Sequence, residues 1–182
     1  GHDDQILEAI DWATDAGARI ISMSLGSARG VNEPFSDPYE TVAANLLAMN
    51  PGVLLVAAAG NESQRPSYTR PVGNPAACPS ILAVSALDQG RGVYERACRG
   101  MDSVGAVDMA APGVSVYSAW TGKGFRTISG TSMATPHVAG VAALCLELDK
   151  NLTARQLWNK LKAHCVQVGT SEDFGAGLVQ AP

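Results

Sequence analysis

The sequence has little charge and no excess of basic residues. Charged residues make up 16% of its 182 positions, and 13 Lys and Arg stand against 17 Asp and Glu, for a formal net charge of −4. Because there is no basic run either, we expect no nucleic-acid partner. A hydrophobic share of 46% excludes a disordered chain. The length predicts a single domain over 1–182 with a substantial buried core.

Long apolar runs are also absent. The longest, at 53–60 and 138–148, fall well short of the ~20 residues that cross a bilayer, so we expect no membrane span. The first ten residues, GHDDQILEAI, contain no initiator methionine and no signal-peptide pattern. We therefore expect that the chain starts internally, as one truncated on its amino-terminal side would.

Apolar patterning predicts an α/β fold. The opening third alternates helix, strand, helix and strand, which favours parallel strands joined by right-handed crossovers. The second of these helices is predicted to begin with a capping box between Asp37 and Glu40. The elements expected are helices at 3–16 and 37–49, strands at 19–25, 53–57, 81–87 and 107–110, a hairpin of 114–120 with 125–129, a helix buried on every side at 131–148, and an amphipathic helix from Thr153 with a Thr153–Gln156 capping box.

The segment GTSMATPHVAG at 130–140 carries the strongest chemical signal. Ser132 falls in the predicted first turn of a buried helix, where the helix dipole and free backbone N–H groups favour negative charge. A nucleophile for acyl transfer is useful there, because its own N–H can donate to the oxyanion. A lone serine at this position is more often only a helix cap.

That segment resembles the nucleophile motif of the subtilisin-like serine proteases, the subtilase family, and the likeness covers nearly the whole chain. It extends to the segments Ile20–Gly26, Val56–Glu62, Pro79–Val84, Ala110–Gly113 and Gly175–Val179. The resemblance implies a three-layer subtilisin-like fold, with a mostly parallel sheet between helices and the amino-terminal part missing. It also implies a serine endopeptidase that forms an acyl-enzyme on Ser132, with Asn61 as the oxyanion-hole amide.

The resemblance further implies that a polypeptide substrate or inhibitor adds to the protein as an extended strand. The substrate-binding residues that it implies are Ser24, Leu25, Gly26, Ala58, Ala59, Gly60 and Thr131. Their small side chains would leave room for a substrate side chain, although small residues also let neighbouring elements pack closely. Glu62 follows at the far end of this pocket and, taken alone, predicts no preference for basic residues.

Two members of the family's triad are missing. The family order is Asp, His, Ser, and the sequence contains no Asp-Thr-Gly, Asp-Ser-Gly or His-Gly-Thr-His. His137 lies five residues beyond Ser132, off its helical face, while His2 and His164 lie in a terminus and after a surface helix. We therefore expect the chain alone to be inactive or very weak, with an open sheet edge and with a partner fragment supplying the Asp and His.

Two other functions stay open. One is a catalytically inert peptide-binding or interaction module derived from the fold. The other is a lipase-like hydrolase, which would need an Asp and a His after the nucleophile. Asp149 and His164 follow Ser132 in the chain but lack supporting motifs.

The cysteines and a cation site complete the expectations. Four cysteines allow three pairings, of which a Cys78–Cys98 bridge would suit a secreted enzyme, extracellular or periplasmic. No cofactor is expected to be required, and no Cys-x-x-Cys spacing favours zinc. The resemblance implies a weak calcium site on the carbonyls of Pro79 and Ile81 with the carboxylate of Asp108, an oxygen set that suits a hard cation.

Overall fold

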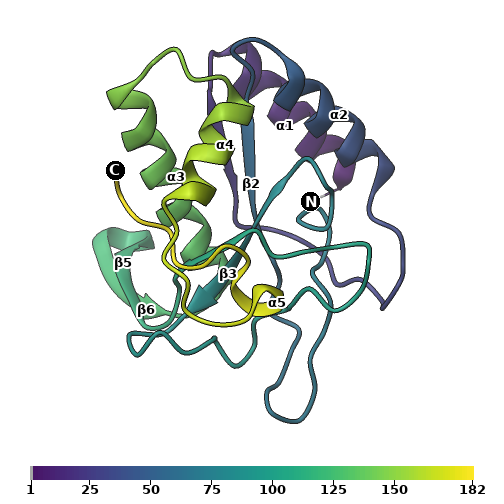
Figure 1. The fold of residues 1–182 in the computed structure, drawn as a ribbon, viewed down its shortest axis with the longest axis vertical. Helices are drawn as coiled ribbons and strands as arrows, with labels where there is room; N and C mark the ends of the chain where they lie inside the picture. The colour runs from purple at the N-terminus through teal and green to yellow at the C-terminus, as the bar shows by residue number, and fades with distance from the viewer. Residues whose placement is uncertain (1) are drawn as a thin grey trace.

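The computed structural model describes residues 2–182 (Figure 1). Helix α1 (Asp3–Asp15), strand β1 (Ile20–Met23), helix α2 (Asp37–Ala48) and strand β2 (Leu54–Ala58) come first. They are followed by β3 (Leu82–Leu87), β4 (Met109–Pro112), β5 (Val116–Trp120), the short 3-10 helix η1 (Thr121–Lys123), β6 (Gly124–Ile128), α3 (Thr131–Leu148), α4 (Ala154–Ala163) and α5 (Ser171–Phe174).

The four strands β1 to β4 form a parallel sheet in chain order, and helices cover both of its faces. Alternate residues of β2 face opposite ways, as the strand period of two requires. Leu54 and Val56 pack in the core with α3 and α4, whereas Leu55 and Ala57 pack with α1 and α2. Figure 1 shows β2 between these two pairs of helices. The predicted three-layer α/β fold is confirmed; that the chain forms one domain stays a prediction.

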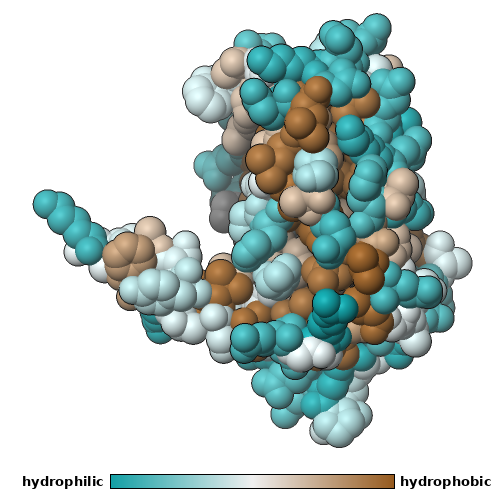
Figure 2. Space-filling model, turned by 60° about the vertical axis from the view of Figure 1, so that its left-hand side comes forward, coloured by the Kyte–Doolittle hydropathy of each residue, from teal (hydrophilic) through white to brown (hydrophobic). Residues whose placement is uncertain are grey.

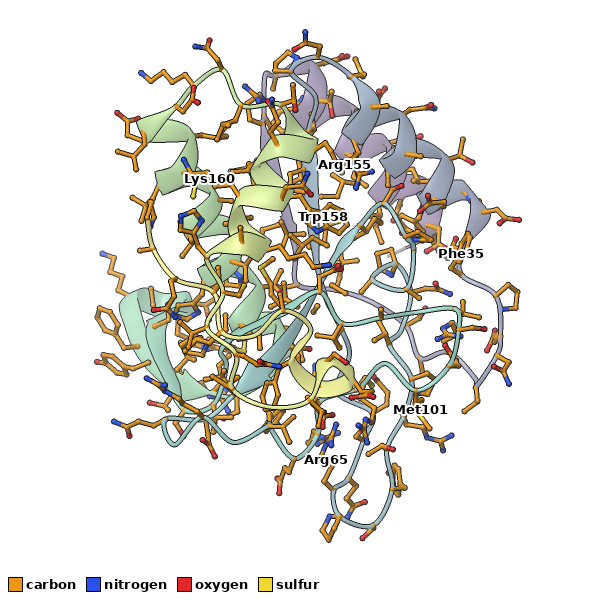
Figure 3. All side chains as sticks on the ribbon, in the orientation of Figure 1. Phe35, Arg65, Met101, Arg155, Trp158 and Lys160 are labelled. Carbon is orange, nitrogen blue, oxygen red and sulfur yellow. The ribbon has the colours of Figure 1, made fainter. Side chains whose placement is uncertain are left out.

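Helix α4 seals one side of the sheet with an amphipathic face, as its pattern predicts. Trp158 points inward and is buried, while the guanidinium of Arg155 lies over its indole at 5.5 Å (Figure 3). The predicted capping box is present, since Thr153 accepts from the Gln156 N–H at 3.2 Å and donates its own N–H to Gln156 at 2.9 Å. Local sequence therefore fixes where this helix begins.

The capping box expected at α2 is wrong. The residue preceding the helix is Ser36, and Asp37 is already helical. Glu40 turns away from the helix end, and its carboxylate accepts from the N–H of Ser80 at 3.0 Å and from the Ser80 hydroxyl at 2.7 Å. A contact 40 residues away in the chain therefore takes the side chain that the local pattern had assigned to the cap.

Helix α3 follows the predicted bounds, but it is not buried on every side. Ala134, Val138 and Ala142 pack into the core, whereas Leu144 is 51% and Leu148 68% exposed. Figure 2 shows apolar surface along this face of the molecule, with the β5–β6 hairpin projecting beside it.

Strand β1 packs against α3 and pairs on one side alone, with β2, in the sheet that residues 2–182 form. The expected open edge is therefore present. None of the helices in these residues has the length and apolar character to cross a membrane.

Candidate active site

Ser132 is the second residue of α3 and is tied to the segment that follows β1. Its hydroxyl donates to the carbonyl oxygen of Ser24 at 3.4 Å, and the Ser24 hydroxyl donates to the carbonyl oxygen of Ser132 at 2.7 Å. That carbonyl is free to accept because its usual helical partner four residues on is Pro136, which has no N–H. Pro136, in the first turns of α3, thus leaves the Ser132 carbonyl free to accept from the Ser24 hydroxyl.

Asn61 lies three residues beyond the end of β2, at the carboxyl edge of the sheet, where open α/β sheets place their sites. Its side-chain oxygen accepts from the backbone N–H of Thr131 at 2.9 Å. Because that bond fixes which way the amide is turned, Nδ2 remains as a donor. Asn61 and Ser132 line the same cavity, so the two predicted catalytic residues meet.

This cavity has a volume of about 210 Å³ and is called here the primary pocket. It is lined by Ser24, Leu25, Gly26, Ser27, Ala58, Gly60, Asn61, Glu62, Gly73, Asn74 and Ser132. Five of the seven predicted substrate-binding residues therefore lie in its wall. Ser27, Gly73 and Asn74 were not predicted, because they reach the pocket through a bridge between distant segments, Ser27 with Asn74.

The other two predicted substrate-binding residues, Ala59 and Thr131, do not line the primary pocket. Ala59 is fully buried in the core on the α1 and α2 side, because it alternates with Ala58 along the chain. Thr131 is also fully buried; its hydroxyl accepts from the Gly60 N–H at 3.3 Å. Thr131 therefore holds Gly60 and Asn61 in place rather than facing a substrate.

The backbone of Asn61 is held at both ends. Its N–H donates to Glu62 Oε2 at 2.7 Å, and its carbonyl accepts from Arg96 Nε at 3.2 Å. The buried Cys98 thiol donates to the same Glu62 oxygen at 3.2 Å, and burial raises the pKa of this thiol to about 12, so it stays a donor. Neither Arg96 nor Cys98 carried a local sequence signal for this position.

Gly60 is the residue that this packing requires to be glycine. Its φ is +116°, and a Cβ would lie 2.6 Å from Glu62 Oε2 and 2.9 Å from Cys98 Sγ. Both the left-handed backbone and the close approach exclude a side chain.

The Cys78–Cys98 bridge, one of the pairings that the sequence left open, is not formed, because all four cysteines are free thiols. Cys78 donates to the carbonyl of Ser36 at 3.5 Å, while Cys98 faces Glu62. Cys145 is buried in α3 as an apolar residue, as its helical context predicts.

The predicted calcium ligand Asp108 is engaged in the sheet. One carboxylate oxygen accepts from the Ala83 N–H at 2.9 Å, and burial raises the pKa of Asp108 to about 6. Within residues 2–182 no group of three acidic, His or Cys side chains could hold a metal. A cation here would therefore depend on the carbonyls of Pro79 and Ile81, and the site stays a prediction.

Neither His137 nor His164 is bonded to Ser132. Each ring Nδ1 is bonded to the carbonyl four residues before it, Met133 at 2.8 Å and Lys160 at 2.7 Å. Ser132 also lines a second cavity of about 430 Å³, called here the hairpin hollow. It lies between the β5–β6 hairpin and the start of α3, on residues Val116–Trp120, Arg126, Ile128, Met133, Pro136 and His137.

The Subtilase family, Peptidase_S8, matches residues 1–177. This chain belongs to the subtilase family. Subtilisin DY of Bacillus licheniformis is 38% identical over 96% of this chain and 59% of its own length. Alkaline elastase YaB of Bacillus sp. (strain YaB) is 40% identical over 97% of this chain and 42% of its own length.

Solved subtilase structures share the fold. Sphericase superposes with a TM-score of 0.86 and 33% identity, covering 100% of this chain and 64% of its own. The prenylagaramide maturation protease PagA superposes with a TM-score of 0.77 and 28% identity, covering 97% of this chain and 64% of its own. The chain thus spans less than two thirds of each of these relatives.

Proposed function

We propose that the chain carries the nucleophile and oxyanion hole of a serine endopeptidase, and that another segment or chain supplies the Asp and His. The observation that carries this is the shared wall of Asn61 and Ser132 in the primary pocket. The N–H groups beside Ser132 are engaged: that of Thr131 donates to Asn61 and that of Met133 to Gly130. The Ser132 N–H and Asn61 Nδ2 are therefore left for an oxyanion.

The reaction would run through an ester on Ser132. Its Oγ attacks the carbonyl carbon of the scissile bond and gives its proton to the supplied imidazole, while the carbonyl oxygen takes the negative charge between Asn61 Nδ2 and the Ser132 N–H. Collapse breaks the C–N bond, and the imidazolium returns the proton to the leaving amine. Water then hydrolyses the ester by the same steps, which releases the acid and restores the hydroxyl.

The hairpin hollow is the place where the imidazole would enter. Ser132 lines both this hollow and the primary pocket, and a base must come to about 3 Å from Oγ. From α3 its lining includes Met133, Pro136 and His137, all in the first two turns of the helix.

A peptide would bind along Ser24, Leu25 and Gly26, which continue the chain beyond β1. The backbone groups of Leu25 and Gly26 make no hydrogen bond within residues 2–182, so they are open to an added strand. We also propose an extracellular or periplasmic location, and this rests on family membership alone.

A chimera tests the proposal. The segment of Subtilisin DY that precedes its match to this chain is joined to residues 2–182, and the product is assayed with a fluorogenic peptide and a fluorophosphonate label. We expect peptide cleavage and labelling of Ser132, both absent from the Ser132→Ala chimera and from residues 2–182 alone. A chimera with a cooperative thermal transition that binds peptide but neither cleaves nor labels would establish the inert module instead.

A further inference from the structure

A third cavity adjoins the primary pocket. It has a volume of about 400 Å³ and is called here the side pocket. Its lining residues are Asp3, Ile6, Leu25, Gly26, Ser27, Ser36, Tyr39, Asn74 and Pro75. Leu25, Gly26, Ser27 and Asn74 belong to both cavities, so the segment that would bind a peptide is a wall common to the two.

Each of the two pockets contains one carboxylate, and no Lys or Arg lines either of them. In the primary pocket this is Glu62, whose Oε2 already accepts from Asn61 and Cys98, which leaves Oε1. In the side pocket it is Asp3, whose Oδ1 accepts from the buried Tyr39 hydroxyl at 3.2 Å, which leaves Oδ2. Both acids are therefore held in place with one oxygen open.

The apolar part of the side pocket suits a long basic side chain. Ile6, Leu25 and Pro75 offer surface to a methylene stem, and Asp3 in the first turn of α1 offers an acceptor for its charged end. Lys and Arg side chains bind in this divided way, with the stem on apolar surface and the head on polar groups. Arg96, bonded to the Asn61 carbonyl, lies outside the lining of both pockets.

We propose that the two pockets together select polypeptides with two basic side chains, one in the primary pocket at Glu62 and one in the side pocket at Asp3. A strand bound along Leu25 and Gly26 sends alternate side chains to the same face, about 7 Å apart, so one peptide can fill both cavities. Glu62 alone carried no such preference. The structure adds the open Oε1 of Glu62 in one pocket and the open Oδ2 of Asp3 in the other, so each pocket has a preference of its own.

This inference rests on the proposed peptide binding, and a binding experiment separates the two. Fluorescein-labelled hexapeptides with one Arg fixed at the carboxyl end and a second Arg moved one residue at a time are titrated into residues 2–182 by anisotropy. Peptides with Leu or Glu at the same places are the references. We expect each Arg in its pocket to tighten binding by about fivefold over Leu, as a partly exposed ion pair does, and Glu to weaken it.

Matched variants assign each preference to its pocket. Asp3→Asn should remove the advantage over Leu of the second Arg alone, and Glu62→Gln should remove the advantage over Leu of the terminal Arg alone. The controls for net charge are Asp4→Asn and Glu95→Gln, which replace exposed acids that line neither pocket. They should leave the advantage of either Arg over Leu unchanged.

The outcomes are distinct. Equal affinities for the Arg, Leu and Glu peptides would overturn the proposed selectivity but not the proposed peptide binding. Equal losses in Asp3→Asn and Asp4→Asn also overturn it, since net charge would then explain the preference. Absence of binding for every peptide overturns this inference and the proposed strand binding together.

Discussion

The hydroxyl of Ser24 donates to the carbonyl oxygen of Ser132 at 2.7 Å, and so the segment Ser24–Gly26, the proposed peptide-binding segment, is bonded directly to the proposed nucleophile. The bond depends on Pro136, which leaves that carbonyl without a helical partner. The same two residues meet again where the Ser132 hydroxyl donates to the Ser24 carbonyl. Motion of the peptide-binding segment would therefore move the nucleophile.

Replacing Ser24 with Ala removes the bond to the Ser132 carbonyl. In the chimera we expect kcat/KM to fall about fivefold, since one hydrogen bond contributes about 1 kcal/mol. Ser103→Ala, which removes an exposed hydroxyl with no bond in the structure, is the control and should leave kcat/KM unchanged. Equal activity of the two variants would contradict the coupling.

Replacing Asn61 with Ala removes the proposed oxyanion donor. We expect kcat of the chimera to fall by about 10²- to 10³-fold with KM nearly unchanged, the loss measured in subtilisin for one such donor. Because the Thr131 N–H also loses its acceptor, a thermal melt of the variant must show that it is folded. A rise in KM with kcat intact would place Asn61 in substrate binding instead.

Replacing Gly60 with Ala tests the packing behind the primary pocket. We expect a loss of about 2 to 3 kcal/mol in the free energy of unfolding, from the left-handed backbone and from the clash with Glu62 and Cys98. Gly122→Ala is the matched control, because Gly122 also has a positive φ, +78°, but nothing within 4 Å of its Cβ position. Urea titrations that give equal losses would show that the clash costs nothing.

A buried ion pair fixes the loop that follows the peptide-binding segment. Arg29 and Asp102 are bonded at 2.9 Å with both side chains almost inaccessible. Arg29 also donates to the Val72 carbonyl at 3.0 Å, so the pair joins three separate segments. Replacing Asp102 with Asn leaves a buried guanidinium unpaired, and we expect about 3 kcal/mol less stability in urea at pH 7.

The pH dependence of stability follows from the same pair. Burial by itself would raise the pKa of Asp102, but the Arg29 guanidinium and the N–H groups of Asn32, Gly105 and Val104 outweigh it and hold the pKa well below its ordinary value. A lowered folded pKa means stability that is present above about pH 4, the unfolded value, and is lost as the pH falls further.

Urea midpoints measured from pH 6 to pH 2.5 check this sign. The wild-type midpoint should fall below about pH 4, and Asp102→Asn should start lower and fall less over the same range. If the urea midpoints of the wild type and of Asp102→Asn fell in parallel with pH, the loss of stability in acid would not come from Asp102.

The sequence predicts what local patterns control. Helix α3, the parallel strands β2 and β3 and the cap at Thr153 need no distant contact to be recognised. Ser132 and Asn61 were predicted from the resemblance of the segments 130–140 and 56–62 to family motifs, which are themselves local patterns, and their catalytic roles stay predictions.

Distant contacts decide the features that were missed. Glu40 bonds to Ser80 instead of capping its own helix. Cys98 reaches Glu62 rather than Cys78. The side pocket exists because the start of α1 meets the loop at Asn74. None of these pairings has a signature within a window of a few residues.

The open edge of β1 has a further consequence for how the chain behaves in solution. Within residues 2–182 the outer edge of β1 pairs with no strand, and α3, which packs against β1, exposes Leu144 and Leu148. Such an edge is a template on which another chain can add, including a second copy. A segment that supplied the catalytic imidazole by pairing with β1 would cover the same edge. Acquiring activity and losing the tendency to aggregate would then be one event, and light scattering would report the assembly as clearly as turnover does.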